Sequence, residues 1–322
     1  MKAAFFMQNG GPDVLQYGDV PDPVAGPGEV LVDVHAASVN GADWKVRTGS
    51  YAPITRFPYV PGRDFSGVVA ALGAGVADLR VGEPVFGVVE QVADGCYAEK
   101  LVIRAAIVAR KPDALGHVEA AAVALIGLTA LVSVEDTLKL KPGETILIQG
   151  GAGGVAGFAV QLAKHIGARV LTTASPANHD YLRTLGADRI IDYIREDFVK
   201  AAAGCDAVFD TVGGEVATRS FAALRPGGRA AFIASGASAP VSPRADVASL
   251  RPKVGRDRTH LERIAALLAR GAVRVPEIRI YPLSEAAEAH RVSEGRHLRG
   301  KLVFKVRCER DEDRSTRERP VA

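Results

Sequence analysis

The sequence predicts an α/β protein with two domains, one mostly β and one built on a parallel sheet, and three observations support this. First, the chain has 322 residues, more than a single hydrophobic core usually serves. Second, residues 1 to about 122 form short alternating apolar segments separated by glycine and proline, a pattern typical of strands. Third, strand-like and helix-like segments alternate after Ala120, which predicts a parallel sheet covered by helices on both faces.

Within the first part, strands are predicted over 28–40, 64–76 and 82–89. In the first of them, every second residue from Val30 to Val34 is valine, and the alternating positions further along hold mainly polar or small residues, as in a half-buried strand. Prolines punctuate the segments that separate the strands.

In the second part, strand 144–149 precedes helix 155–167, and strand 168–174 precedes a helix that ends at Gly186. Three further strands are expected in RIIDY, CDAVFDTV and GRAAFIAS. After these, a helix over 261–271, a β segment (RVPEIRIYPL), a second helix (SEAAEAHRVSEG) and a strand (KLVFKV) are expected to pack back onto the first part.

These patterns predict the domain bounds. Residues 1–122 and 262–306 form the β domain, and residues 123–261 form the parallel-sheet domain. Residues 307–322 are rich in charge with almost nothing apolar, which predicts a disordered tail. A functional charged arm is the alternative reading of this tail.

Composition argues against several classes of function. A net charge of +3 gives no reason to expect nucleic acid or anionic membranes as partners. Three widely separated cysteines form no CxxC pair, which favours a reducing compartment, the cytoplasm. The N-terminus lacks the apolar core of a signal peptide. The apolar run 120–134 is shorter than the roughly 18 residues of a membrane span, so we expect a buried helix there and no membrane partner.

A glycine-rich turn opens the predicted helix 155–167. The segment Gly151-Ala152-Gly153-Gly154-Val155-Ala156 fits the pattern G-x-G-x-x-G/A, and it follows an apolar strand. In this pattern the first glycine permits the tight turn, the second lets the backbone approach a diphosphate, and the small last residue lets helix and strand pack closely. Free N–H groups at the helix start then face the phosphates. A dinucleotide site is predicted, with a turn made only for packing as the alternative.

The end of the next strand bears on the choice between NAD and NADP. An NAD site usually has Asp or Glu about 20 residues after the glycines, but 170–175 contains no carboxylate. Ser175 and Asn178 can donate hydrogen bonds there, and His179 and Arg183 are near in sequence. The sequence therefore favours NADP(H), although Ser175 could also be only a helix N-cap.

Several motifs, in order, resemble the medium-chain dehydrogenases/reductases, and among them the zinc-free quinone oxidoreductases, the zeta-crystallin-like group. The resemblance covers residues 1 to about 306 and rests on GPGEVLVDVHAASVNGADWKVRTGSY, PYVPGRDFSGVV, GLTA, the glycine turn, LGADRIIDY and AHRVSEGRHLRGKLVF. It implies a Rossmann cofactor domain beside a GroES-like catalytic domain. It also implies NADPH-dependent reduction of a quinone or an α,β-unsaturated carbonyl compound, and a homodimer formed through an edge strand of the cofactor domain.

No metal is expected. Zinc-dependent relatives have a cysteine three residues before an aspartate and a His-Glu pair further on, whereas this chain has Asn40 before Asp43 and the pair Arg63-Asp64. Neither Asn nor Arg is a zinc ligand. The cysteine-rich loop that holds structural zinc is also missing, since Cys96 stands alone. Without a Lewis acid, reduction of an electron-poor acceptor is easier than oxidation of an alcohol.

The resemblance also implies roles for single residues. Asn40 corresponds to an asparagine at the nicotinamide end of the cofactor, Tyr51 to a tyrosine at the mouth of the pocket, and Thr129 to a threonine near the ribose and phosphates. Tyr193 corresponds to a tyrosine near the adenine 2′-phosphate, and Lys301 to a cationic cofactor contact. For each there is a structural alternative: a turn cap, a packing aromatic, a helical hydroxyl, a strand-end residue and a solvated lysine, respectively.

Two positions depart from the family. Lys45 stands where some members have a second tyrosine, and Arg63 is a large cation beside the expected cleft. Arg63 could bind a substrate oxygen, or it could pair with Asp43 or Asp64. Asn40, Arg63 or nearby N–H groups are candidates for stabilising the anion formed by hydride addition. Tyr51, Lys45 or solvent could supply the proton.

Two other functions remain open at this point. One is a pathway-specific enoyl reductase that acts on a natural-product or thioester intermediate, because pocket loops rather than the fold set the substrate. The other is an NADPH-binding protein with little turnover.

Overall fold

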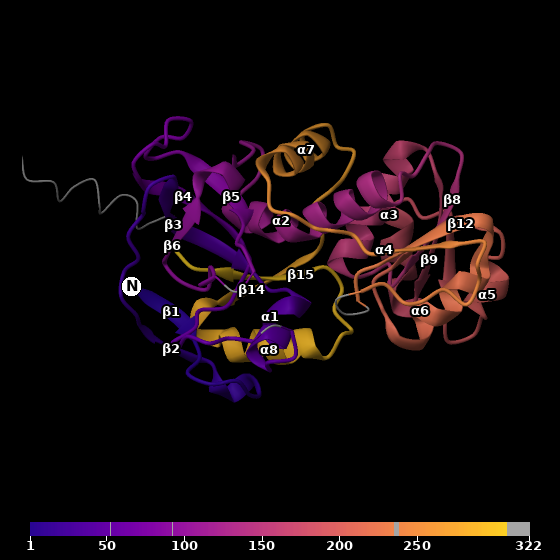
Figure 1. Cartoon of the computed structure of the whole chain (residues 1–322), viewed down its shortest axis with the longest axis horizontal. Helices are drawn as coiled ribbons and strands as arrows, with labels where there is room; N and C mark the ends of the chain where they lie inside the picture. Colours follow the sequence, from indigo (N-terminus) through magenta and orange to yellow (C-terminus); the bar gives the residue numbers. More distant parts are fainter. Residues whose placement is uncertain (52, 92, 235–237, 308–322) are drawn as a thin grey trace, which may run out of the picture.

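The computed structural model describes residues 1–51, 53–91, 93–234 and 238–307, so most of the predicted tail lies outside the described residues. The chain forms two parts that lie end to end along the long axis of the molecule (Figure 1). One part contains the N-terminal strands together with the C-terminal elements, and the other contains the middle of the chain.

The first part is built on a seven-stranded sheet in which sequence-distant strands are neighbours. Its order is β14 (Ile278–Pro282), β15 (Lys301–Lys305), β3 (Glu29–Ser38), β4 (Asp64–Leu72), β5 (Pro84–Val88) and β7 (Val108–Arg110), with β6 (Lys100–Arg104) also paired to β3. Strand β15 runs antiparallel to β3, so the C-terminal segment does return onto the N-terminal part. A separate pair, β1 (Lys2–Phe5) and β2 (Gln16–Asp19), lies at the N-terminus.

The second part is a six-stranded parallel sheet. Its order is β10 (Arg189–Asp192), β9 (Arg169–Ala174), β8 (Thr145–Gln149), β11 (Cys205–Asp210), β12 (Leu224–Phe232) and β13 (Ala248–Leu250). Counted along the chain this is 3-2-1-4-5-6, the doubly wound order of dinucleotide-binding domains. The predicted Rossmann architecture is therefore confirmed.

Helices cover both faces of this parallel sheet. Successive side chains of each strand point to opposite faces, and the apolar side chains on each face need helices to bury them. Ile146 and Ile148 pack with α3 (Gly154–Ile166), whereas Leu147 packs with residues from α5 (Phe198–Ala201) and α6 (Gly214–Ser220). Helix α4 (His179–Thr184) joins β9 to β10. The strands that sequence analysis expects at 144–149 and 168–174, and the helix at 155–167, are each present within one residue of the expected ends.

Helix α2 (His117–Leu131) joins the two parts. It packs against β3, β4, β5 and β15 on one side and against α3 and α7 (Arg258–Ala269) on the other, so most of its circumference is buried. This explains why it is apolar nearly all round. The helix continues as a π-helical segment, Val132–Thr137, and the whole of His117–Thr137 is long and apolar enough to cross a membrane. The expected buried helix is confirmed, although it is longer than the apolar run indicated.

Helix α1 (Gly41–Arg47) is not predicted by the sequence analysis. It begins with a capping box, in which the Asn40 N–H donates to Asp43 Oδ2 at 2.8 Å. The fully buried Arg47 fastens α1 to α8 (Ala286–Glu294) through hydrogen bonds with His290 and Glu294. The remaining short helices are 3-10 turns at Pro12–Val14, Ala105–Ile107, Pro176–Asn178, Phe221–Ala223 and Leu283–Glu285.

His260 makes the stability of the fold depend on pH. Its Nδ1 lies 2.7 Å from Asp257 Oδ2, and its Nε2 lies 2.8 Å from Asp136 Oδ2, so it ties α7 to the π-helical segment after α2. Burial alone would lower the pKa of His260, but the hydrogen bonds with Asp257 and Asp136 outweigh it and raise the pKa above its ordinary 6.5. The bridge therefore stabilises the fold fully below pH 6.5, and this contribution is lost as the pH rises through the raised value.

We expect His260→Gln to lower the free energy of unfolding by about 0.5–1 kcal/mol at about pH 6. The loss should shrink at about pH 9, because the stabilisation by the charged imidazole is lost as the pH rises through the raised pKa. Urea unfolding of the parent and the variant at the two pH values measures this difference. His165→Gln, at an exposed position on α3, is the matched control. A loss that is equal at both pH values would contradict a charged bridge.

Candidate active site

The glycine turn lies between the end of β8 and the start of α3, and its glycines meet different surroundings. A Cβ on Gly151 would lie 2.2 Å from Thr172 Oγ1, so this glycine is required for packing against β9. A Cβ on Gly153 would meet nothing closer than Gly150 O at 3.5 Å. Gly153 is the N-cap of α3, and the first N–H groups of the helix have no intrahelical acceptors. The turn therefore offers an uncovered backbone surface with free donors, which fits a diphosphate.

This turn also touches the first part of the molecule. Gly153 and Gly300 form an isolated β-bridge, and the Gly300 N–H donates to Ala152 O at 3.2 Å. A Cβ on Gly154 would lie 3.1 Å from Lys301 Cδ and 3.2 Å from Ile126 Cγ2. The expected diphosphate site therefore lies at the junction of the two parts.

Lys301 is the centre of a buried hydrogen-bond network on the catalytic side of this junction. Its Nζ donates to Val39 O at 2.8 Å and to Asn40 Oδ1 at 2.7 Å, and lies 3.4 Å from Asp64 Oδ2. Lys301 is 4% exposed and Asp64 is 0% exposed. All three ammonium donors thus point to protein oxygens, so the reading of Lys301 as a solvated lysine is wrong. Its assignment as a direct cofactor contact stays a prediction.

Asp64 holds the other members of this network. Its Oδ2 accepts from Asn40 Nδ2 at 3.0 Å and from the Ser38 hydroxyl, and its Oδ1 accepts from the Leu125 N–H at 3.0 Å. The Asn40 amide is therefore fixed at both ends, with its oxygen on Lys301 and its nitrogen on Asp64. Asn40 is at once a helix cap and part of the site, so the two readings of this residue are compatible.

Arg63 lies beside this network and faces Tyr51. Its Nε is 3.9 Å from Asp43 Oδ1, a long ion pair, and its Cζ is 5.4 Å from the centroid of the Tyr51 ring. Burial raises the pKa of Asp43 to about 6, against the effect of Arg63 and of hydrogen bonds from Asn40 and Tyr97. Of the two partners expected for Arg63, the structure gives Asp43, while Asp64 pairs with Lys301. No side-chain hydrogen bond of Arg63 is found among the described residues, so its guanidinium retains free donors.

The residues expected at the adenosine end come together at the carboxyl edge of the parallel sheet. Ala174 and Asp192 are register partners on β9 and β10, so Ser175 and Tyr193, which follow them, are neighbours. Asn178 Nδ2 donates to Ser175 Oγ at 3.2 Å, and Tyr193 is 51% exposed. Ser175 caps a 3-10 turn without a side-chain hydrogen bond to its backbone, which leaves the hydroxyl hydrogen available. No carboxylate follows β9 directly.

Thr129 lies inside α2 and is 8% exposed. Its carbonyl accepts from the Ser133 hydroxyl at 2.7 Å, whereas its own hydroxyl has no hydrogen bond within the part of the chain that the structure describes. The alternative that this hydroxyl is used up by bonding within its own helix is therefore not supported. Contact with a cofactor stays a prediction.

Two positions that carry zinc ligands in zinc-dependent relatives hold Asn40 and Arg63 here. Asn40 accepts a hydrogen bond from Lys301, and Arg63 forms a long ion pair with Asp43. Cys96 is buried and donates its S–H to Asp64 O at 2.9 Å. Within the described ranges, no three His, Cys, Asp or Glu residues lie close enough together to hold a metal ion. The prediction of a metal-free reaction therefore rests on the kinds of residue present, and metal analysis is its test.

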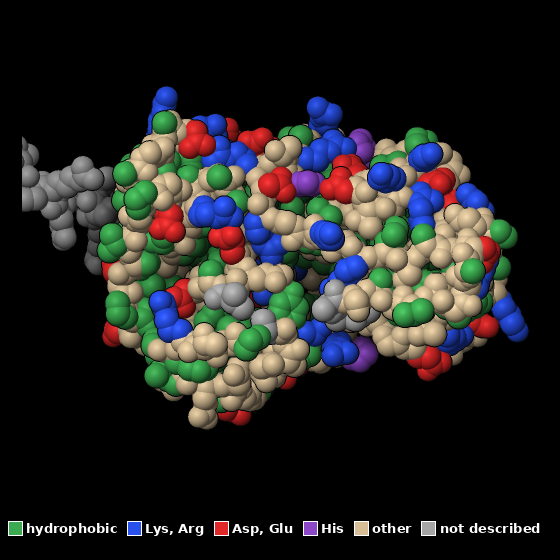
Figure 2. Space-filling view, viewed as in Figure 1, with side chains coloured by type: hydrophobic (Ala, Val, Ile, Leu, Met, Phe, Trp, Pro, Cys, Tyr) green, Lys and Arg blue, Asp and Glu red, His purple; other side chains and the backbone are tan. Residues whose placement is uncertain are grey.

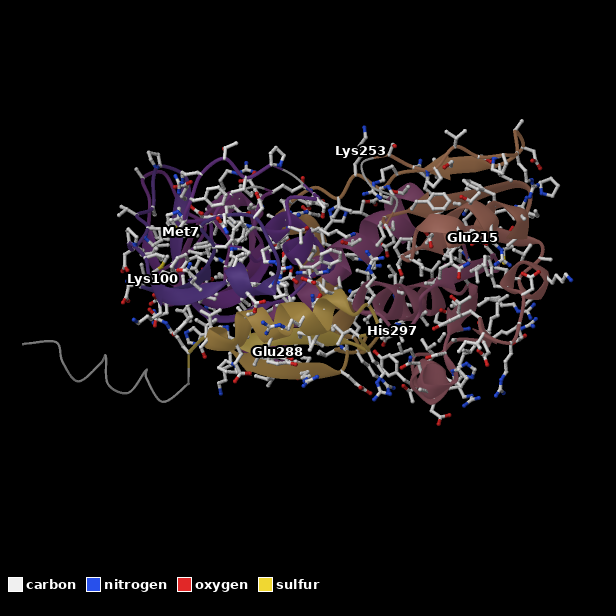
Figure 3. All side chains as sticks on the ribbon, turned by 90° about the horizontal axis from the view of Figure 1, so that it is seen from below. Met7, Lys100, Glu215, Lys253, Glu288 and His297 are labelled. Carbon is white, nitrogen blue, oxygen red and sulfur yellow. The ribbon has the colours of Figure 1, made fainter. Side chains whose placement is uncertain are left out.

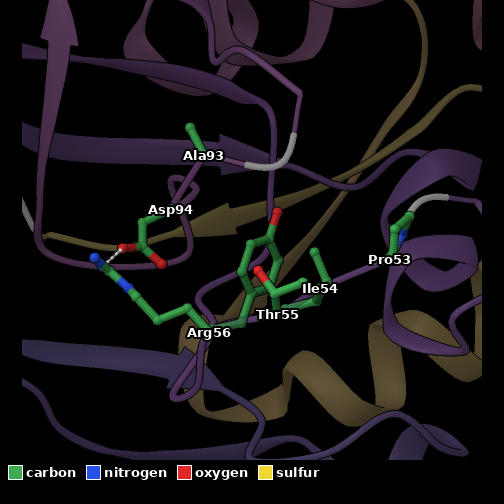
Figure 4. A pocket seen from close by; sticks show the side chains of 7 residues that line it. Pro53, Ile54, Thr55, Arg56, Ala93 and Asp94 are labelled. Atoms are coloured by element: carbon green, nitrogen blue, oxygen red, sulfur yellow. Dashed lines mark hydrogen bonds and ion pairs between the residues drawn. The ribbon is translucent and has the colours of Figure 1, made fainter.

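The space-filling view shows a hollow where the two parts meet, with Lys and Arg side chains around it (Figure 2). A pocket of about 320 Å³ opens on the first part, lined by Pro53, Ile54, Thr55, Arg56, Tyr59, Ala93 and Asp94 (Figure 4). Arg56 and Asp94 join its two loops through an ion pair of 2.5 Å, but both side chains are exposed, so this pair adds little stability.

Sequence reasoning missed Asp64 and Ser38 as parts of the site. From the sequence, Asp64 is the second residue of the Arg63-Asp64 pair and a possible partner of Arg63, and no role is predicted for Ser38. A usable signal was present, because a charged residue at the start of an apolar strand needs a partner when it is buried. The identity of that partner, Lys301, depends on the pairing of β15 with β3, which no local pattern specifies.

Two family models match the chain. The alcohol dehydrogenase GroES-like domain matches residues 26–113, and a model described as zinc-binding dehydrogenase matches residues 185–304. The second description names a metal-binding group, although the positions discussed above carry Asn40 and Arg63.

Curated relatives include free-standing enzymes and parts of much larger ones. A quinone oxidoreductase of Pseudomonas aeruginosa is 32% identical over 93% of this chain and 98% of its own length. A chloroplastic NADPH-dependent alkenal/one oxidoreductase of Arabidopsis thaliana is 32% identical over 94% of this chain and 79% of its own. A pikromycin polyketide synthase component of Streptomyces venezuelae is 35% identical over 88% of this chain, but the chain spans only 8% of the length of that synthase.

Among solved structures, the quinone oxidoreductase of Escherichia coli in complex with NADPH superposes with a TM-score of 0.88. The match is 28% identical and covers 95% of this chain and all of the other. Fold, motif order and full-length similarity agree, and the chain therefore belongs to the medium-chain dehydrogenase/reductase family, within its quinone oxidoreductase group.

Proposed function

We propose that the protein is an NADPH-dependent oxidoreductase that reduces a quinone or an α,β-unsaturated carbonyl compound without a metal ion. The observation that carries this proposal is the uncovered turn at Gly153, placed against a catalytic part whose metal-ligand positions hold Asn40 and Arg63. Full-length relatives named as quinone and alkenal/one oxidoreductases support it, as does the relative solved with NADPH.

The residues divide into those that hold the cofactor and those that act on the acceptor. The backbone from Gly151 to Val155 would hold the diphosphate, and Ser175, Asn178 and Tyr193 would hold the adenosine phosphate. No carboxylate directly follows β9, so a 2′-phosphate beside Ser175 does not meet the acidic residue that an NAD site usually has there. When bound, NADPH supplies the hydride that adds to the electron-poor carbon of the acceptor.

The chain's own part in the chemistry is to position the acceptor and to stabilise negative charge. The network of Lys301 and Asp64 fixes the Asn40 amide beside the glycine turn. Arg63 has free donors and faces Tyr51, so we assign it to the oxygen that becomes negative. Tyr51 is 44% exposed, accepts a hydrogen bond from Gln91 Nε2 at 3.3 Å and is open to water, so it or solvent can return the proton.

The first experiment follows the loss of nicotinamide absorbance when the protein is mixed with 1,4-benzoquinone or 3-buten-2-one, with NADPH and NADH in separate arms. We expect consumption of NADPH and a lower kcat/KM with NADH. Metal analysis should find no stoichiometric zinc in the active protein. Activity should also persist after dialysis against a chelator. Tight NADPH binding without consumption across these acceptors would favour a binding protein with little turnover, and a need for stoichiometric zinc would overturn the metal-free reaction.

Arg63→Gln tests the proposed role of this cation. We expect kcat/KM for 3-buten-2-one to fall by about tenfold, because a donor to the developing oxyanion is lost. The Kd for NADPH should stay within about twofold, since Arg63 lies on the acceptor side. Arg63→Lys, which keeps the charge but not the forked donors, should recover part of the rate. Unchanged kinetics in the Gln variant would leave Arg63 as only the partner of Asp43.

The similarity to polyketide synthases favours a second candidate, an enoyl reductase that acts on a thioester intermediate. It uses the same site and the same chemistry, so only the acceptor distinguishes it.

We also propose a homodimer formed through the edge strand β13 of the parallel sheet, which sedimentation velocity tests. The free, buried thiols of Cys96 and Cys205 suit a reducing compartment, and we propose the cytoplasm.

A further inference from the structure

Among the described residues, four cations near the junction of the two parts form no ion pair: Lys45 lies near Arg296 and Arg251, and Arg251 and Arg256 each lie near Tyr51. We call Lys45, Arg251, Arg256 and Arg296 the cation cluster. Lys45 Nζ lies 5.6 Å from the centroid of the Trp44 ring, and Arg296 Cζ lies 5.5 Å from the same centroid. One indole ring therefore carries two cations, and neither forms an ion pair or a side-chain hydrogen bond with another described residue.

The other two members follow β13, and one of them, Arg256, reaches across the junction. Arg251 Nη1 donates to Phe232 O at 2.6 Å. Arg256 Nε donates to Val89 O, just beyond the end of β5, at 3.1 Å, and its Nη1 donates to two carbonyls of its own segment. Backbone carbonyls orient these guanidinium groups but do not neutralise them. In Figure 3, Lys253 and His297, which lie close in sequence to members of the cluster, are seen on opposite edges of the junction.

The carboxylates near the cluster are already engaged. Asp64 faces Lys301, and Asp43 faces Arg63. Glu90 accepts two hydrogen bonds from Arg104, at 3.0 and 2.7 Å. The cluster therefore keeps an excess of positive charge. Burial lowers the pKa of Lys45, and the charges of Arg296 and Arg251 lower it further. Burial likewise lowers the pKa of Arg256, with Arg63 adding to the effect.

Lys45, Arg251 and Arg256 are half-buried, whereas Arg296 is exposed. An anion bound among the half-buried cations would offset their repulsion and their loss of hydration. The phosphates of the cofactor do not account for this anion. The expected diphosphate site lies at Gly153, and the expected 2′-phosphate site lies at Ser175 and Tyr193, at the carboxyl ends of β9 and β10. Trp44 belongs to α1 in the first part, and Arg251 and Arg256 lie near Tyr51, the residue expected at the mouth of the acceptor pocket.

We infer that the cation cluster binds an anionic group of the substrate, so that the acceptor is an α,β-unsaturated carbonyl compound carrying a carboxylate or a phosphate. This inference rests on the proposed function and narrows it. Reduction adds a hydride from NADPH to the β-carbon and a proton to the α-carbon, and yields NADP⁺ and the saturated carbonyl compound. The anionic group takes no part in bond changes and only orients the acceptor.

Matched pairs of acceptors test the inference. One pair is (E)-4-oxopent-2-enoate and its methyl ester, which compares a carboxylate with a neutral group. The other is crotonyl-coenzyme A and crotonyl-N-acetylcysteamine, which compares a phosphate-bearing thioester with a neutral one. We expect at least one anionic member to have a kcat/KM about tenfold or more above that of its neutral partner. This preference should decline from about 20 to about 300 mM salt because the attraction is screened. The pair with the larger preference identifies the anion as carboxylate or phosphate.

Lys45→Gln and Arg296→Gln connect the preference to the cluster. Each should lower the ratio of anionic to neutral kcat/KM by about fivefold, with the Kd for NADPH within about twofold of the parent value. Lys200→Gln, at an exposed position on α5 in the other part, is the matched control and should leave the ratio unchanged. Equal kcat/KM within both pairs for the parent protein would overturn the inference. So would an equal loss of NADPH affinity in the two variants, since the cluster would then serve the cofactor.

Failure of the proposed function is distinguishable from failure of this inference. If no acceptor is reduced, the proposed function is wrong, and calorimetric titration of the NADPH complex still decides about the cluster. The saturated ligands 4-oxopentanoate and its methyl ester test the carboxylate, and butyryl-coenzyme A and butyryl-N-acetylcysteamine test the phosphate. Tighter binding of an anion by about tenfold, lost in Lys45→Gln, supports the cluster as an anion site, and equal binding within both pairs overturns it.

Discussion

Gly153→Ala is expected to weaken NADPH binding by about 10- to 100-fold, or about 1.4–2.8 kcal/mol, while the fold stays intact. A Cβ at this position has room within the protein, because its nearest neighbour is Gly150 O at 3.5 Å. The backbone conformation, φ −71° and ψ 156°, also suits alanine. The added methyl group instead occupies the surface on which the diphosphate approaches the backbone. Fluorescence titration with NADPH and a thermal melt without it measure the two effects separately.

Two other glycines make this experiment specific. Gly11 is also an N-cap, with φ −68° and nothing within 4 Å of an added Cβ, so Gly11→Ala should change neither the melt nor the Kd. Gly151→Ala should mainly lower the melting temperature, because its Cβ would collide with Thr172 Oγ1 on β9. If Gly153→Ala binds NADPH as tightly as the parent, the diphosphate does not lie on this turn and the proposed cofactor site is wrong.

The elements that sequence patterns located correctly are those whose structure is decided locally. The glycine turn, the strands on either side of it and helix α3 follow from glycine placement and apolar periodicity within roughly 30 residues. Short elements were harder to predict from the sequence. Helix α1 has seven residues and depends on the capping box of Asn40 and Asp43, and the π-helical end of α2 has no sequence signature.

The sequence supplied candidate residues for the site but not their arrangement. Family resemblance selected Asn40 and Lys301, yet their direct hydrogen bond joins residues 261 positions apart and depends on β15 lying beside β3. The choice of Asp43 over Asp64 as the partner of Arg63 has the same origin, since Lys301 already faces Asp64. Side-chain chemistry limits the possible partners, and strand order decides among them.

The network around Lys301 leads to the largest expected effect on stability. Lys301→Met should lower the free energy of unfolding by about 3–5 kcal/mol, because it leaves the fully buried Asp64 carboxylate without its cation. Methionine is nearly as long as lysine and apolar, so loss of packing adds little. Lys305→Met, at an exposed position on the same strand β15, is the control and should change stability by less than about 0.5 kcal/mol. Urea unfolding at neutral pH measures both variants against the parent.

The double variant Asp64→Asn with Lys301→Met separates two effects of Lys301. One is the stability that it gives by neutralising Asp64, and the other is its role in NADPH binding and turnover. Removing both charges leaves no uncompensated ion, so about half or more of the lost stability should return. The introduced asparagine can still accept the Leu125 N–H through its amide oxygen, which keeps this end of the network in place. If Lys301 acts only by positioning Asn40, the double variant should bind NADPH nearly as tightly as the parent but reduce acceptors more slowly. A deficit in NADPH affinity that persists after stability is restored would show instead that the Lys301 ammonium exchanges a protein oxygen for a cofactor phosphate.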